Sequence, residues 1–299
     1  GSSANIDGKD LSLNGPITWL DLDPTKPWKG SLQVDSRTCP YSSAFSPDGK
    51  KLYLTGYNNI SSRVKHWLDG VMVLDYGKDE KPKVFVGEFK HQNGMTTSVA
   101  CDKEGKVYVA NYTEGSIDVY SPEAKLLKKI SVEYPTSLSI NPTNGEIYVF
   151  SWPIHNVDMI KENKWQGNLP KLTHLGTAED PKKIAEYPLP LPVLGNWWAK
   201  HPYGPLYCGE IDSWSDQTTI WISMVHGGAL ERGIGGGGDG FANYGSWENA
   251  GVKGFVAKEG KLELKYDFGK DSTVESGRAK PAILSRQRLY VNPASEKLY

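Results

Sequence analysis

Residues 46–54 read SPDGKKLYL, a tight polar turn followed by a short strand that carries an aromatic residue between two leucines. The same phrase returns at residues 102–109 as DKEGKVYV and at residues 141–149 as NPTNGEIYV. Each copy follows a run of small and apolar residues. Short apolar runs separated by Gly, Pro, Asn and Asp are typical of antiparallel strands joined by tight turns.

Weaker copies of this strand pair occupy residues 208–222 and 289–299, and second hairpins are predicted within 70–86, 116–130 and 254–264. Two consecutive hairpins make a four-stranded sheet. Four-stranded antiparallel sheets repeated along one chain are the blades of a β-propeller, so the sequence predicts an all-β propeller.

The whole chain, residues 1–299, is predicted to be one propeller domain with a Gly-rich loop at 235–250. The predicted blades cover approximately 17–34 (partial), 40–89, 94–133, 134–190, 203–269 and 283–299 (partial). Two closures fit this pattern. Either the two partial blades join into one and close a five-bladed ring, or the ring is larger and its remaining blades are missing or lie on another chain. The shortness of the final strand favours the larger ring.

The phrases SPDGKKLYL, DKEGKVYVANYTEGSIDVYSPEAKLLKKI and NPTNGEIYVF resemble NHL- and YVTN-type propeller repeats. The resemblance covers about two thirds of the chain and implies the fold. It also extends distantly to propeller-fold lyases. Function does not follow from the fold, because this architecture supports lyases, hydrolases, oxidoreductases and binding proteins.

Composition excludes some partners. The formal net charge is −1, so nothing in the overall composition points to nucleic acid, and apolar runs are too short to cross a membrane. The three cysteines, Cys39, Cys101 and Cys208, are too few for a disulfide scaffold, and their pairing is left open. The tag-like opening Gly1-Ser2-Ser3 and the aromatic-rich loops favour a secreted or periplasmic protein.

Propeller topology places the loops between blades on the same face as the loops between second and third strands. This predicted face collects five of the six histidines together with several arginines. A face rich in imidazole and guanidinium groups favours an anionic or carbohydrate ligand. Its predicted substrate-binding residues are Arg37, Arg286, His201, Trp197, Trp198, Asn58 and Asn111.

Two schemes would use such a face. In a lyase acting on a uronic-acid-containing glycan, Arg or His neutralises the carboxylate while His and Tyr act as acid and base. The predicted catalytic residues are His91, His155, His226, Tyr57 and Tyr112. In the second scheme, His91, His155 and His226 hold a divalent metal ion. Tyr57 and Tyr112 follow second strands, where aromatic residues more often pack between blades than contact a ligand.

Two other functions are possible. A glycoside hydrolase needs two facing carboxylates, and the candidates are Glu210, Asp212, Glu231 and Asp239. The first two are predicted to lie within an inner strand and the other two in a mobile loop, which ranks this reaction below the lyase. The chain could instead be a propeller without catalysis that binds a glycan, a peptide or a second chain completing the ring.

Overall fold

The computed structural model describes residues 3–6, 9–12, 42–55, 58–61, 64–67, 69–78, 82–88, 96–151, 171–189, 206–212, 214, 217–225, 251–267, 291–292 and 296–298. Within these ranges all regular structure is β, arranged as four four-stranded and three two-stranded antiparallel sheets. The predicted fold class is confirmed. No helix long and apolar enough to cross a membrane occurs in this described part of the chain.

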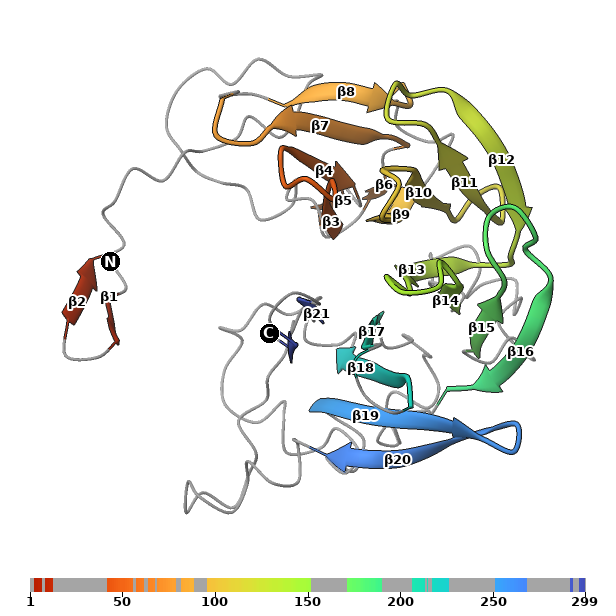
Figure 1. Cartoon of the computed structure of the whole chain (residues 1–299). Helices are drawn as coiled ribbons and strands as arrows, with labels where there is room; N and C mark the ends of the chain where they lie inside the picture. The colour runs from red at the N-terminus through yellow and green to blue at the C-terminus, as the bar shows by residue number, and fades with distance from the viewer. Residues whose placement is uncertain are drawn as a thin grey trace.

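Each four-stranded sheet is one blade, and its strands follow chain order from the centre outward (Figure 1). Blade 1 contains β3 (Ser42–Phe45), β4 (Lys51–Thr55), β7 (Val71–Asp75) and β8 (Lys83–Val86). Blade 2 contains β9 (Thr96–Cys101), β10 (Val107–Asn111), β11 (Ser116–Tyr120) and β12 (Leu126–Ser131). Blade 3 contains β13 (Pro135–Ile140), β14 (Ile147–Ser151), β15 (Lys171–Leu175) and β16 (Lys183–Pro188). Blade 4 contains β17 (Leu206–Asp212), β18 (Thr219–Val225), β19 (Gly251–Lys258) and β20 (Lys261–Asp267).

Three short hairpins accompany the blades: β1 (Ser3–Ile6) with β2 (Lys9–Ser12), β5 (Asn58–Ser61) with β6 (Val64–Trp67), and β21 (Val291–Asn292) with β22 (Lys297–Leu298). The first hairpin was not predicted, and of its residues only Ser3 belongs to the tag-like opening. The second hairpin is inserted in the chain between β4 and β7, which pair directly with each other in blade 1. β21 contacts β17, so it continues the series of inner strands around the centre.

The turns between first and second strands depend on one polar residue at their start. In blade 2, Oδ1 of Asp102 accepts hydrogen bonds from the backbone N–H of Glu104 and of Lys106, both at 2.9 Å. Gly105 completes this turn with a φ of 83°, a left-handed value that disfavours residues with a side chain. In blade 1, Oγ of Ser46 accepts the N–H of Lys51 at 2.9 Å. Short polar side chains therefore cap the hairpins that the sequence predicted.

The hydrophobic core lies between the blades. The cluster between blades 1 and 2 includes Tyr53, Val71 and Val99, all at most 3% exposed. Similar clusters join blade 2 to blade 3 around Tyr108 and blade 3 to blade 4 around Tyr148. The aromatic residue of the repeated phrase is therefore the residue that packs each blade against the next one.

Hydroxyl groups join the inner strands of neighbouring blades. Oγ of Ser42 accepts the N–H of Val99 at 3.1 Å, and Oγ of Ser98 accepts the N–H of Leu138 at 3.2 Å. Oγ1 of Thr97 donates to the carbonyl oxygen of Pro135 at 2.7 Å. These bonds align the inner strands of blades 1, 2 and 3 and satisfy polar groups close to the ring centre.

Several predicted elements lie outside the described residues. These are the partial blade at 17–34 and the Gly-rich loop at 235–250, so the blade boundaries and the blade number stay predictions. His174, which the sequence did not place, lies on β15. Its Nε2 is 2.8 Å from Oε2 of Glu146, and its ring stacks on Tyr148 with the ring centroids 4.2 Å apart. This contact is part of the packing within blade 3.

Candidate active site

Equivalent residues on the four inner strands are identified by their cross-strand partners. The aromatic residue of each second strand pairs with one inner-strand residue, and these partners are Ala44, Ala100, Ser139 and Glu210 in blades 1 to 4. Blades 1 and 2 thus carry a methyl group at this position, and blades 3 and 4 carry polar groups. A departure from the repeat toward polarity near the ring centre marks a candidate functional site.

The two polar residues contact each other across the boundary between blades. Oγ of Ser139 on β13 donates to Oε2 of Glu210 on β17 at a distance of 2.9 Å. Ser139 is 5% exposed, and Glu210 is half-buried. β13 and β17 are the neighbouring inner strands of blades 3 and 4, so the contact joins these two blades at their inner strands (Figure 1).

Burial raises the pKa of the Glu210 carboxyl from its usual 4.5 to about 7, and the hydrogen bond from Ser139 acts in the opposite direction. A carboxyl group with this pKa exchanges a proton near neutral pH. It can therefore remove a proton from a water molecule and return it later in the same reaction, which is general acid–base chemistry.

Asp212, two residues further along β17, has a structural role that the repeat explains. Its Oδ2 accepts a hydrogen bond from Nε1 of Trp221 at 2.9 Å. Asp102 of blade 2 does the same for the hydroxyl of Tyr108 at 3.0 Å. Asp212 thus orients the aromatic residue of blade 4. Glu210 and Asp212 do lie within one inner strand, as the sequence predicted.

Most of the predicted site residues lie outside the described residues, and their roles stay predictions. This holds for the histidines, the arginines, Tyr57 and the Trp pair, namely His91, His155, His226, His201, Arg37, Arg286, Tyr57, Trp197 and Trp198. Asn58 lies on β5, where its backbone pairs with Trp67.

Tyr112 and Asn111 are described, and both lie at the turn between β10 and β11. The ring of Tyr112 packs against Tyr134 with centroids 5.7 Å apart. Oδ1 of Asn111 accepts the N–H of Glu114 at 3.2 Å, and its Nδ2 donates to Asp118 at 3.3 Å. The structure thus brings these two residues together within one turn, where the amide of Asn111 stabilises the turn itself.

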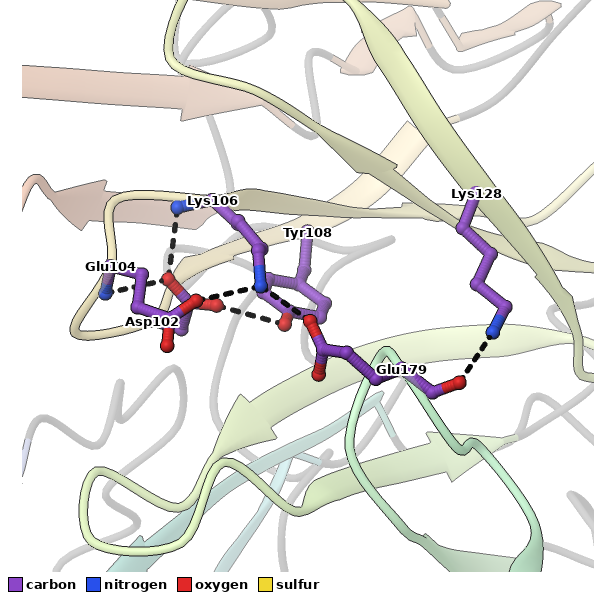
Figure 2. A network of polar contacts seen from close by, with 6 residues as sticks. All are labelled: Asp102, Glu104, Lys106, Tyr108, Lys128 and Glu179. Carbon is purple, nitrogen blue, oxygen red and sulfur yellow. Dashed lines mark hydrogen bonds and ion pairs between the residues drawn. The ribbon is translucent and has the colours of Figure 1, made fainter.

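A separate charged network lies around the turn that follows β9 (Figure 2). Nζ of Lys106 contacts Oε2 of Glu104 at 2.7 Å and Oε1 of Glu179 at 2.5 Å. Nζ of Lys128 donates to the backbone oxygen of Glu179 at 3.0 Å. Because Glu179 lies between β15 and β16, this network joins blade 3 to blade 2.

The described residues do not by themselves form a metal site. Among them no group of three or more His, Cys, Asp or Glu side chains could hold a metal ion. Glu210 and Ser139 supply one carboxylate and one hydroxyl, which is fewer ligands than a divalent cation requires. The metal site predicted at His91, His155 and His226 lies outside the described residues.

The fold and this site define a propeller with an ionisable inner-strand carboxyl. A family profile described as SMP-30/Gluconolactonase/LRE-like region matches residues 5–152, just under half of the chain. The profile is not that of the NHL repeats that the sequence resembles. A search of curated proteins finds no match.

Solved structures with a similar fold include hydrazine synthase of Kuenenia stuttgartiensis, at 17% identity and a TM-score of 0.43, covering 80% of this chain and 52% of that one. The calcium-binding protein regucalcin of Agrobacterium tumefaciens C58 is similar at 21% identity and a TM-score of 0.33, over 48% of this chain and 49% of that one. A gluconolactonase of Xanthomonas campestris is similar at 16% identity and a TM-score of 0.26, over 37% and 34%. The chain spans about half the length of the first two proteins.

These comparisons correct the predicted function. The prediction of a lyase acting on uronic-acid-containing glycans is wrong, because the matching family is described by a lactonase and not by polysaccharide lyases. The alternatives of a glycoside hydrolase and a binding propeller are not tested by this match and stay predictions. The prediction rested on the number of histidines in the loops of one face, and that number does not determine which side chains meet in space. The inner strands, which carry Glu210, were expected to have a structural role only.

Sequence reasoning set Glu210 aside because it lies within a strand. The signal that identifies it is the aligned register, in which Ala44, Ala100, Ser139 and Glu210 share one position.

Proposed function

We propose that this chain forms part of a lactonase-like propeller hydrolase, in which Glu210 is the general base for opening a cyclic ester. The observation that carries the proposal is the Glu210 carboxyl, held by Ser139 near the ring centre with a pKa raised to about 7. The family match over residues 5–152 supports the reaction class, and Glu210 lies outside the matched segment.

The reaction adds one water molecule to the lactone. Ionised Glu210 removes a proton from the water, whose oxygen attacks the carbonyl carbon of the ester. The tetrahedral intermediate collapses with cleavage of the ring C–O bond, and protonated Glu210 returns its proton to the departing alkoxide oxygen. The product is a hydroxy acid. Near neutral pH it loses its carboxyl proton to the solvent, so each turnover releases one proton.

The pKa of Glu210 sets the expected pH profile. The base is active when ionised, so the rate rises with pH and reaches half its maximum at about pH 7. A carboxyl at its usual pKa of 4.5 would already be ionised, so the rate would stay nearly constant around pH 7.

The proposal is tested by adding glucono-1,5-lactone to the 299-residue chain and following proton release with an indicator dye, after subtraction of spontaneous hydrolysis. Glu210→Gln is expected to lower the rate by roughly 100-fold or more, since a positioned base contributes about 10²–10⁴-fold. Glu123→Gln, which alters an exposed turn residue, is the matched control and is expected to match the wild type.

Two results would overturn the proposal: a wild-type chain that does not accelerate lactone opening, or a Glu210→Gln variant with full activity. The same assay with a chelator tests the predicted divalent metal. Loss of activity on chelation and recovery with Ca²⁺ or Zn²⁺ would support a metal held by residues beyond Glu210 and Ser139.

Three further expectations form part of this proposal. An anionic or carbohydrate-like lactone fits the cationic face that the sequence predicts. The matching family consists of six-bladed propellers, which favours a ring larger than five blades, and a second chain that completes the ring stays an expectation from the sequence. Secretion or a periplasmic location stays a prediction from the sequence.

A further inference from the structure

Among the described residues, the strands packed most closely against β17 carry almost no charge. These neighbours are β13 (PTSLSI), β14 (IYVFS), β18 (TIWISMV) and β21 (VN). None of these four carries a charged side chain, and their one titratable group is Tyr148. On β17 itself Asp212 is engaged with Trp221. Within the described residues, the polar partner of Glu210 is therefore Ser139.

The position of Ser139 differs from that of the hydroxyls in the other inner strands. Ser42 and Ser98 accept backbone N–H groups of the next blade, and so their role is to join strands. Ser139 instead donates to a side chain and contacts one carboxyl oxygen, Oε2. No hydrogen bond to the other oxygen, Oε1, is found among the described residues.

We propose that Ser139 is a positioning residue for Glu210: its hydroxyl fixes Oε2 and leaves Oε1 to accept the proton of the attacking water. The catalytic part of this inference rests on the proposed lactonase function. The hydroxyl donates to the ionised carboxylate and so stabilises the form that acts as a base. Without the Ser139 hydroxyl, the Glu210 carboxyl keeps its proton to higher pH. Neither of its oxygens is then held in place by Ser139.

The chain itself shows that alanine is tolerated at this place, because Ala44 and Ala100 occupy the equivalent position in blades 1 and 2. Ser139→Ala therefore removes the hydroxyl and places at this position a residue that blades 1 and 2 already carry there. Ser139→Thr retains the hydroxyl and is the rescue variant. Ser137→Ala, two residues earlier on the same strand, removes a hydroxyl for which no hydrogen bond to Glu210 is found among the described residues, and it is the matched control.

Two readouts separate this inference from the proposed function. The first is the pH profile of lactone hydrolysis. Ser139→Ala is expected to be about tenfold slower than wild type near pH 6 and within about twofold near pH 8.5, because a hydrogen bond to a charged group is worth about one pH unit in the midpoint. The second is ¹³C NMR titration of the Glu210 carboxyl, assigned by its absence in Glu210→Gln, which requires no turnover.

An upward shift of the carboxyl midpoint in Ser139→Ala, with wild-type values in Ser139→Thr and Ser137→Ala, supports the inference. An unchanged midpoint in Ser139→Ala overturns it, whatever the activity. If the midpoint moves while the wild-type chain opens no lactone, the coupling of Ser139 to Glu210 stands and the proposed function fails. A rate that falls equally at every pH would show a merely structural role for Ser139.

Discussion

The ring of Phe150 lies directly over Cα of Gly209, so closely that a Cβ at residue 209 would come within 2.0 Å of the ring carbon Cζ. Phe150 is fully buried on β14, and Gly209 precedes Glu210 on β17. The missing side chain thus lets an aromatic ring of blade 3 approach the inner strand that presents Glu210. Packing between blades and the placement of the candidate base are coupled at this contact.

Gly209→Ala is expected to destabilise the protein by about 1–3 kcal/mol, because the added methyl group must displace a ring in a closely packed core. The free energy of unfolding in urea measures this cost. Phe150→Leu combined with Gly209→Ala should recover part of the loss, so the two substitutions should couple in a double-mutant cycle. Strictly additive effects would show that the ring does not press on residue 209.

Glu210→Gln is expected to change how stability depends on pH. The pKa of Glu210 is raised from 4.5 to about 7, so the folded state binds its proton more tightly than the unfolded state. Stability from this group is therefore fully present below about pH 4.5 and falls as the pH rises toward about 7.

The variant lacks this titration, so its melting temperature relative to wild type should increase between these pH values. Glu123→Gln is again the control. Parallel curves for Glu210→Gln and wild type would contradict the raised pKa.

The ion pair of Glu179 with Lys106 should show the opposite dependence. The hydrogen bond from Lys106 lowers the pKa of Glu179 to about 2 from its usual 4.5. The stabilisation is present above about pH 4.5 and is lost as the pH falls toward about 2. Because the Glu179 side chain is 65% exposed, Glu179→Gln should cost no more than about 1 kcal/mol at neutral pH.

Roughly 1 M NaCl should reduce this difference further, since salt screens exposed charges. The measurement is urea unfolding of Glu179→Gln and of the wild type, each without added salt and in roughly 1 M NaCl. A cost that is large and independent of salt would mean that the network is buried in solution.

Cys101 should react slowly with thiol reagents in the folded protein. Burial raises the pKa of its thiol to about 12, so almost none of it is the reactive thiolate near pH 8. In a Cys39→Ser, Cys208→Ser background, labelling of Cys101 by a disulfide reagent is expected to be at least about tenfold faster in denaturant than without it. Equal rates in the two conditions would show that the thiol is accessible in the folded state.

The repeat of strand, polar turn and aromatic-centred strand could be predicted from the sequence because its determinants are local. Gly105 and Asp102 define a turn within four residues, and apolar alternation defines the strands on either side. Even the place of Glu210 on an inner strand followed from this pattern. The lyase prediction failed because it depended on which loop residues meet, and no local rule decides that.

The amino-acid sequence alone determined the all-β class, the turns and the aromatic residues that pack between blades, since backbone hydrogen bonding and side-chain alternation act over a few neighbouring residues. Only the tertiary structure decided the chemistry of Glu210. Its proton affinity depends on burial between blades and on the hydroxyl of Ser139, which is 71 residues away in the chain and 2.9 Å away in space. Neither quantity exists until the sheets have packed around their common centre.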